Sequence, residues 1–184
     1  MNSVKCSAAR RRTEATLVRR ATAEDAPAIH RLVARHAAEG HLLPRTLTEL
    51  TDHADRFLVA TVRGRIVGCA ELAPLSTGLA EVRSFVVTAR SRGRGVGRLM
   101  VDELRSRARR RGFEQLAAFT HSPSYFARLD FSTVPHASLP EKIATDCHRC
   151  ALFGHCGQSA MVLNLESALD SAPLAPENHV SQRS

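Results

Sequence analysis

The segment from Glu81 to Arg98 constrains this chain most, because it joins an apolar run, a glycine-rich turn and the start of a helical pattern. Residues 79–87 are apolar and β-branched enough for a buried strand. Three glycines follow within residues 90–97, and they let backbone N–H groups converge without obstruction by a Cβ atom. The segment therefore predicts a strand, a turn and a helix in direct succession.

The helix expected after this turn favours an anion at its start. Apolar residues recur with the period of one helical face, at Val96, Leu99, Met100, Val101, Leu104 and Ala108. The first turn of a helix carries N–H groups without intrahelical partners and the positive end of the helix dipole. We therefore expect a phosphate or pyrophosphate over the glycines.

Two well-known glycine loops do not fit the turn. A Walker loop ends in Gly-Lys-Ser/Thr, whereas this turn closes Gly97-Arg98-Leu99, and a dinucleotide fingerprint needs an acidic residue about 20 residues further on, after a second strand. The run Arg92-Gly93-Arg94-Gly95-Val96-Gly97 instead resembles the acetyl-CoA signature Arg/Gln-x-x-Gly-x-Gly/Ala of the GNAT acetyltransferase superfamily. The strand before the run and the helix after it agree with this resemblance.

The resemblance implies a cofactor clamp for acetyl-CoA. In the family, backbone groups after the arginine bind the pyrophosphate, and the backbone of the preceding strand pairs with the pantetheine arm. The cofactor-binding positions that this implies are Phe85, Val86, Val87, Arg92, Gly93, Arg94, Gly95, Val96, Gly97 and Arg98. The alternative is a turn that only starts a helix.

Composition limits the classes of partner. The net charge of +8 comes almost entirely from arginine, and a positive field suits a polyanionic cofactor and a dicarboxylate substrate. With one tyrosine and no tryptophan, stacking platforms for nucleic acid are scarce, so a nucleic-acid partner is not expected. No apolar run approaches the length of about 18 residues that a membrane span needs, and we expect a cytoplasmic protein.

The order of patterns predicts one α+β domain between two tails. We expect a basic disordered tail over residues 1–13, a GNAT domain over 14–166 and a disordered tail over 167–184. Within the domain the order β-α-α-β-β-β-α-β-α-β-β is similar to the GNAT fold. That resemblance implies a mixed, largely antiparallel and splayed central sheet flanked by helices. Between the last two strands the residues themselves predict a loop that contains Cys147, Cys150 and Cys156.

Glu81 is the candidate general base. An acidic residue is unusual in a strand that is otherwise apolar, and alternation places Glu81, Arg83 and Phe85 on one face. Acetyl transfer needs a neutral amine, and in many family members an acidic residue on this strand deprotonates the amine through water. The alternatives are a structural pairing with Arg83 and a charge at the rim.

The proton donor to the departing thiolate is less defined. Many family members use a tyrosine in the helix after the fifth strand, and here that position is Phe126. Tyr125 is one residue early, which rotates it by about 100° around a helix. Water, or no dedicated acid, therefore stays open.

Two further segments resemble short, single-domain bacterial N-acetylglutamate synthases. They are Leu42-Leu43-Pro44-Arg45-Thr46 and Leu139-Pro140-x-Lys142 with the cysteines that follow. An α-amino dicarboxylate needs cations for both carboxylates, and the candidates are Arg45, Arg83 and Lys142. A solvated surface arginine is the alternative for Arg45.

The cysteines after these segments have two interpretations. Cys147, Cys150 and Cys156, with histidines alongside, have the ligand types of a structural zinc site. Alternatively they are reduced thiols that brace a loop near the acceptor.

Together these patterns predict an acetyl-CoA-dependent N-acetyltransferase acting on the α-amine of an amino acid, with L-glutamate as acceptor at the start of arginine biosynthesis. The expected partner is this small amino-acid substrate, and a homodimer stays open. The enzyme alternative is a GNAT acetyltransferase acting on another small amine or a protein amino group. The non-enzyme alternative is a basic nucleic-acid-binding module with a cysteine-rich metal knuckle, which leaves the cofactor signature unused.

Overall fold

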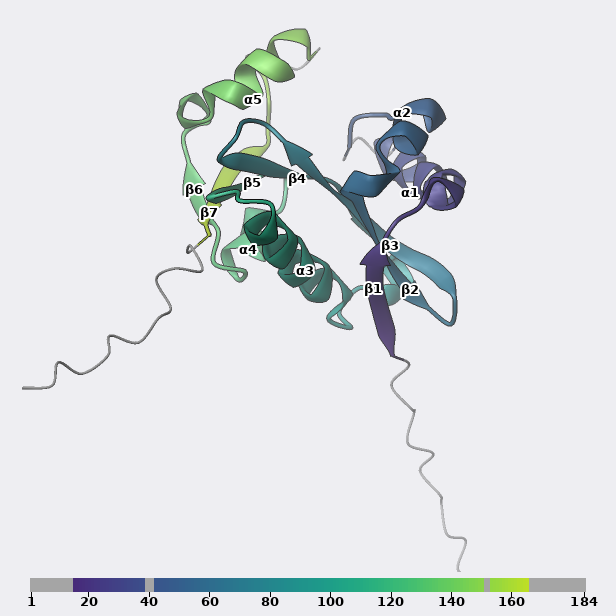
Figure 1. The fold of residues 1–184 in the computed structure, drawn as a ribbon. Coiled ribbons are helices and arrows are strands. Elements are labelled where there is room, and N and C mark those ends of the chain that lie inside the picture. Colours follow the sequence, from purple (N-terminus) through teal and green to yellow (C-terminus); the bar gives the residue numbers. More distant parts are fainter. Residues whose placement is uncertain (1–14, 39–41, 151–152, 166–184) are drawn as a thin grey trace, which may run out of the picture. The chain divides into compact units, whose positions relative to one another are not determined.

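The computed structural model describes residues 15–38, 42–150 and 153–165 (Figure 1). Its strands form a seven-stranded sheet in the order β1-β2-β3-β4-β5-β7-β6, so the predicted α+β fold with a mixed, largely antiparallel sheet is confirmed. Contacts divide the chain into an N-terminal unit, residues 1–73 and 82–104, and a C-terminal unit, residues 74–81 and 105–184. The predicted tails lie outside the described residues, and the domain limits of 14 and 166 stay predictions.

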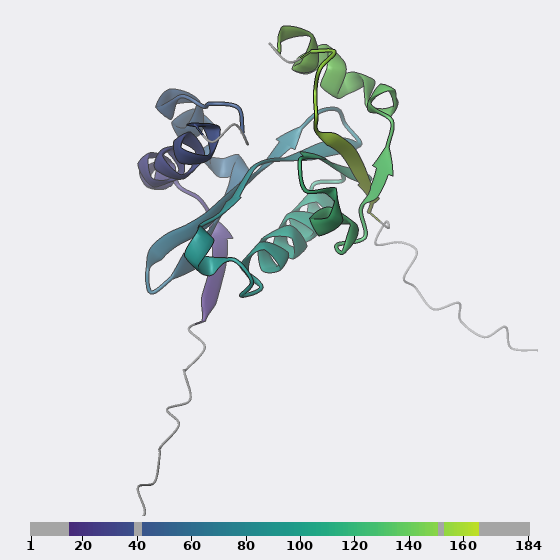
Figure 2. The same ribbon diagram turned by 180° about the vertical axis from the view of Figure 1, so that it is seen from behind.

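The N-terminal unit begins with a strand, two helices and a hairpin. These are β1 (Thr16–Arg20), α1 (Ala26–Ala38), α2 (Leu47–Asp52), β2 (Phe57–Val62) and β3 (Arg65–Pro74). β2 pairs antiparallel with both β1 and β3, and α1 and α2 lie side by side (Figures 1 and 2). Apolar side chains from the helices and strands, among them Ile29, Leu50 and Phe57, are buried together as the core of this unit.

Local sequence determines where the two helical segments begin. The backbone N–H of Thr46 donates to Glu49 at 2.8 Å, and the backbone N–H of Glu49 donates to the Thr46 hydroxyl at 3.2 Å. Before α1, the backbone N–H of Thr22 donates to Asp25 at 2.9 Å. Hydrogen bonds from Arg19 hold the pKa of Asp25 down at about 2, so this cap stays charged. Each helical segment thus begins with a capping box, in which a Thr and the acidic residue three positions later pair with each other's backbone N–H groups.

β4 (Leu79–Val87) leads through the glycine turn into α3 (Val96–Arg110), as predicted. Ser84 has a φ of 48°, a left-handed conformation that a non-glycine residue rarely adopts within a strand. A left-handed residue interrupts the extended backbone, and with it the alternation of side chains between the two faces. The predicted common face of Glu81, Arg83 and Phe85 therefore cannot be extended across Ser84.

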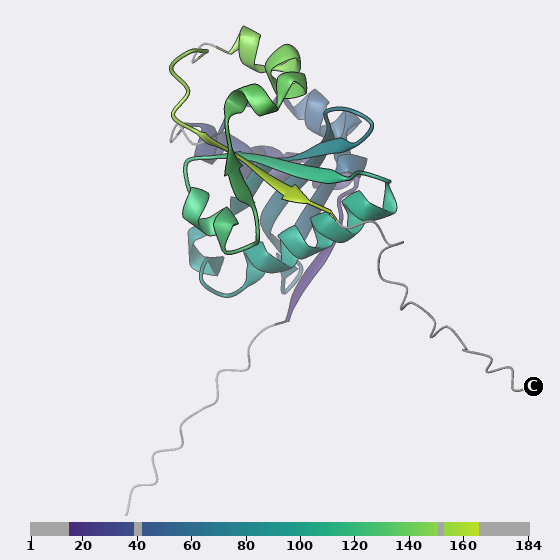
Figure 3. The same ribbon diagram turned by 90° about the vertical axis from the view of Figure 1, so that its left-hand side faces the viewer.

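The C-terminal unit contains the remaining strands and two short helices. They are β5 (Gln115–Thr120), α4 (Pro123–Ala127), β6 (Ser132–Val134), α5 (Pro140–Thr145) and β7 (Ser159–Asn164). β7 lies between β5 and β6 and is antiparallel to both. Figure 3 shows α5 beyond one end of the strands of this unit.

The segment between β6 and β7 differs from the loop that the sequence predicts, because it contains α5 and a 3₁₀ turn over Cys147–Arg149. α5 starts after Leu139, whose side chain cannot cap a helix, so only Pro140 in the first turn marks its beginning. Among the described helices, none combines the length and the apolar character needed to cross a bilayer.

Gly68 provides a test of the packing in the N-terminal unit. A Cβ atom there would lie 2.9 Å from the carbonyl oxygen of Val86 and 2.9 Å from Sδ of Met100. Because the carbonyl cannot move away without disturbing β4, Gly68→Ala should lower the free energy of unfolding by about 1–3 kcal/mol. Urea denaturation would measure it.

The matched control is Gly157→Ala, whose new Cβ would find its nearest neighbour, a ring carbon of His121, at 3.9 Å. It should change the free energy of unfolding by less than about 0.5 kcal/mol. Equal stability of the two variants would contradict the packing described for Gly68.

Candidate active site

The glycine turn between β4 and α3 depends on two left-handed residues. Gly93 and Gly95 have φ angles of 72° and 80°, which side-chain-bearing residues rarely adopt. The turn is held at its start by the backbone N–H of Thr88, which donates to Val67 at 2.8 Å, and by that of Ser91, which donates to Thr88 at 2.8 Å. The glycines are therefore required by the path of the backbone.

A run of backbone N–H groups in this turn lacks internal acceptors. The N–H of Arg92 donates to Ala89 and that of Leu99 donates to Gly95, at 3.3 and 3.0 Å. For the six residues between them, 93–98, no described group accepts a hydrogen bond from the backbone N–H. With the dipole of the 15-residue helix α3 behind it, this run can bind an anion.

The side chain of Arg92 braces the turn. Its Nε donates to the carbonyl oxygen of Val87 at 3.0 Å, and its Nη2 lies 3.2 Å from Nε2 of His36. Of the predicted pantetheine-binding positions, Val86 is buried in the core, whereas Phe85 and Val87 are half-buried. The predicted cofactor residues thus form one continuous stretch within the N-terminal unit.

Glu81, the predicted base, is paired with Lys142. Its side chain is 4% exposed, and Nζ of Lys142 donates to both of its carboxylate oxygens at 2.8 Å. Nζ also donates to Asp146 at 2.9 Å and lies 5.2 Å from the ring centre of Phe119. An ammonium has three N–H donors, so these three oxygens use all of them.

Arg45 is likewise paired with a buried carboxylate. Its Nη1 donates at 2.9 Å to Glu71 on β3, whose side chain is 2% exposed. Nε lies 3.8 Å from Glu49, too far for a hydrogen bond, so a guanidinium with five donors keeps several N–H groups available. Arg83, the third predicted substrate cation, is half-buried on β4 two residues after Glu81.

Three residues of these arrangements are absent from the sequence-based prediction. Asp146 lies four residues after Lys142, a spacing that could have indicated the ion pair. Glu71 is a lone acid within the apolar run of β3, the same signal that identified Glu81. His36 gives no such signal, because its position in the sequence fits the apolar stripe of α1.

Phe126 occupies the position where many family members carry the tyrosine that protonates the departing thiolate. It is buried in α4 and packs edge-on against Phe131, with ring centres 5.2 Å apart. Tyr125 packs edge-on against Phe126, at 5.5 Å, and lies under the guanidinium of Arg128. Phe126 thus serves as a core residue and offers no proton.

The described residues do not support the predicted zinc site. Among the residues that the structure describes, no three His, Cys, Asp or Glu side chains are arranged to hold a metal ion. Cys147, Cys150 and Cys156 are thiols in the C-terminal unit, and burial is the main cause that raises the pKa of Cys147. The ligand types are present in the sequence, but the 3₁₀ turn that starts at Cys147 and ends before Cys150 does not bring a full set of described ligands together.

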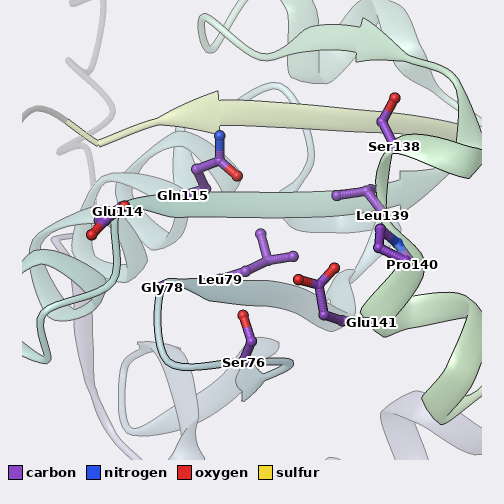
Figure 4. Close-up of a pocket in the computed structure, with 9 residues that line it drawn as sticks. All are labelled: Ser76, Gly78, Leu79, Glu114, Gln115, Ser138, Leu139, Pro140 and Glu141. Carbon is purple, nitrogen blue, oxygen red and sulfur yellow. The ribbon is translucent and has the colours of Figure 1, made fainter.

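A pocket of about 360 Å³ lies within the C-terminal unit. Figure 4 shows Leu79 at its centre, Glu114 and Gln115 on one side and Glu141 on the other. None of the predicted cofactor, base or substrate residues lines this pocket, so it is not the candidate site.

Comparison with known proteins assigns this fold to a class of enzyme. The profile of the acetyltransferase (GNAT) family matches residues 19–131. The chain belongs to this family and is an acyltransferase. This result contradicts the non-enzyme alternative, a nucleic-acid-binding module with a metal knuckle.

Individual relatives and solved structures are also similar to this chain. An uncharacterized N-acetyltransferase of Chlorobaculum tepidum is 33% identical over 150 residues, which are 82% of this chain and 97% of the relative. An amino-acid acetyltransferase of Mycobacterium tuberculosis is 34% identical over 121 residues, 64% of this chain and 69% of the relative. A crystal structure from M. tuberculosis in complex with CoA and NLQ has a TM-score of 0.71 at 29% identity, covering 82% of this chain and 99% of that one.

The N-acetylglutamate synthase of Neisseria gonorrhoeae, solved with coenzyme A and N-acetyl-glutamate, has the same fold, with a TM-score of 0.75 at 24% identity. The match covers 83% of this chain but only 35% of that one.

The glycine turn leads to a prediction about cofactor binding. Gly95→Glu should abolish acetyl-CoA binding, because the substitution strains a backbone with a φ of 80° and adds a negative charge where the N–H run favours an anion. Calorimetry on the folded variant would measure the affinity.

Gly64→Glu is the matched control. Gly64 has a similar φ of 72° and open space around its Cβ position, but it lies in the β2–β3 hairpin. It should carry a similar backbone cost and leave cofactor affinity unchanged. If Gly95→Glu bound acetyl-CoA as tightly as this control, the turn would not be the clamp.

Proposed function

We propose that this chain is an acetyl-CoA-dependent N-acetyltransferase that acts on the α-amine of an amino acid, with L-glutamate as the acceptor. The run of unpaired backbone N–H groups over residues 93–98, at the start of α3, is the observation on which the proposal rests. It suits the diphosphate of acetyl-CoA. The relative from M. tuberculosis that was solved with CoA, at 29% identity, supports the same cofactor.

In the proposed reaction the ammonium of the amino acid first loses a proton to Glu81 through a water molecule. The neutral amine then attacks the thioester carbonyl of acetyl-CoA, and backbone N–H groups on β4 stabilise the oxyanion. Collapse of the tetrahedral intermediate breaks the C–S bond, the acetylated nitrogen gives up its second proton to water to become an amide, and the CoA thiolate takes a proton from water. In the ion pair with Lys142, Glu81 is a carboxylate, which is the form that a base requires.

L-Glutamate as acceptor is supported by the cations and by the relatives. Arg45 keeps N–H groups that can bind a substrate carboxylate in a bidentate manner. Lys142 uses its three donors on Glu81 and Asp146, so it would bind substrate only by exchanging one of them. The M. tuberculosis relative is named an amino-acid acetyltransferase, in agreement with this substrate class.

With glutamate as acceptor, the enzyme would catalyse the first step of arginine biosynthesis in the cytoplasm, and a homodimer stays part of the proposal. The alternative acceptor is another small amine or a protein amino group.

The role of Glu81 can be tested by Glu81→Gln. The amide keeps the shape but cannot accept the proton, so kcat should fall by roughly 10²-fold and the acidic limb of the pH–rate profile should disappear. Acetyl-CoA affinity should be retained. Steady-state kinetics across the pH range would measure both.

The matched control is Glu141→Gln, a nearby carboxylate at the start of α5 that lines the pocket and takes no part in the proposed chemistry. Its pH–rate profile should equal that of the wild type. A Glu81→Gln variant that also kept the wild-type profile would make Glu81 a structural residue.

The acceptor can be tested with Arg45→Lys. The lysine keeps a cation beside buried Glu71 but loses the guanidinium fork, so the KM for glutamate should rise about 10- to 100-fold, corresponding to a charge-assisted bond of about 1.5–3 kcal/mol. The KM for acetyl-CoA should not change. CoA release by the wild type should be fast with glutamate and slow with glutamine.

Equal turnover of glutamate, glutamine and alanine by the wild type would remove the dicarboxylate acceptor. The acetyltransferase itself would stand, and the alternative acceptor amines would be tested next.

A further inference from the structure

His36 lies in the last turn of α1 and is 9% exposed. Each ring nitrogen has a partner. Nδ1 lies 3.0 Å from the carbonyl oxygen of Leu32, and Nε2 lies 3.2 Å from Nη2 of Arg92 in the glycine turn. The imidazole therefore connects α1 to the residue that opens the cofactor signature.

The partners determine which nitrogen carries the proton. A carbonyl oxygen can only accept, so Nδ1 must donate to Leu32. A guanidinium can only donate, so Nε2 must be the unprotonated acceptor for Arg92. His36 is thus a neutral imidazole whose lone pair is directed at the guanidinium.

Arg92 is fixed at two of its nitrogens. Nε donates to Val87 at the end of β4, and Nη2 donates to His36, while the rest of the residue is exposed. A guanidinium has five N–H groups, and the remaining ones have no acceptor in the described part of the chain. Holding a long side chain in one conformation before binding avoids the loss of rotamer entropy on binding.

We propose that His36 is a positioning residue for the acetyl-CoA phosphates, acting through Arg92. It holds the side chain of Arg92, the residue directly before the run of backbone N–H groups, in one conformation, so that the remaining N–H donors of the guanidinium can bind the same anion. This inference rests on the cofactor part of the proposed function and is independent of the acceptor.

Two amide substitutions separate the contacts of the imidazole. In His36→Gln the amide oxygen can reach Arg92 as Nε2 does, whereas in His36→Asn the shorter amide can reach only the Leu32 carbonyl. His36→Asn should raise the Kd for CoA roughly tenfold, and His36→Gln should stay within about twofold of the wild type. Calorimetry with CoA measures Kd, and thermal unfolding shows that both variants fold.

A truncated thioester shows where the effect arises. S-acetylpantetheine has no diphosphate, so kcat/KM with this donor should be equal in the wild type and in His36→Asn. With acetyl-CoA, KM should rise in His36→Asn while kcat holds. A loss of the same size with both donors would show a general structural defect and overturn the proposal.

A double-mutant cycle with Arg92→Met tests whether His36 acts through Arg92. Once Arg92 is replaced, His36→Asn should weaken CoA binding no further. Additive effects, or a Kd for His36→Asn equal to that of the wild type, would refute the role of His36 while leaving the acetyltransferase intact. Absence of CoA binding by the wild type would instead overturn the proposed function together with this inference.

Discussion

Two carboxylates buried in strands impose the strongest electrostatic constraint on this structure. Glu71 on β3 and Glu81 on β4 are almost fully excluded from water, and each needs a cation within its own unit. Arg45, before α2, supplies one and Lys142, in α5, supplies the other. Removing one partner of such a buried pair costs about 3–5 kcal/mol, because the remaining charge is left uncompensated. Each pair therefore ties a helical segment to a strand as well as placing a charge in a candidate site.

The glycine turn between β4 and α3 is stabilised in a different way. Its two left-handed glycines leave backbone N–H groups without partners, and such groups are costly unless a ligand or water pairs with them. The side chain of Arg92 stabilises the turn through its hydrogen bonds to Val87 and to His36. A side chain thus stabilises the turn, while the backbone N–H groups of the turn stay available to bind an anion.

Pairing also limits how the predicted substrate cations can act. Lys142 has no donor left while it holds Glu81 and Asp146, whereas Arg45 keeps part of its guanidinium available beside Glu71. A substrate carboxylate can therefore be added at Arg45 without breaking an ion pair, but at Lys142 only by exchange. The predicted base and one predicted substrate cation are consequently coupled in one ion pair, between Glu81 and Lys142.

Local sequence by itself determined the glycine turn, the two capping boxes and the order of strands and helices, because each depends on residues a few positions apart. It could not reveal α5, which has no capping side chain, or the left-handed conformation of Ser84 within an apparently regular strand. The pairings were decided by tertiary structure alone. Glu81 and Lys142 are 61 residues apart, Arg45 and Glu71 are 26 apart, and His36 and Arg92 are 56 apart. No local pattern links residues at such separations, since their contact results from the packing of strands and helices that each form independently.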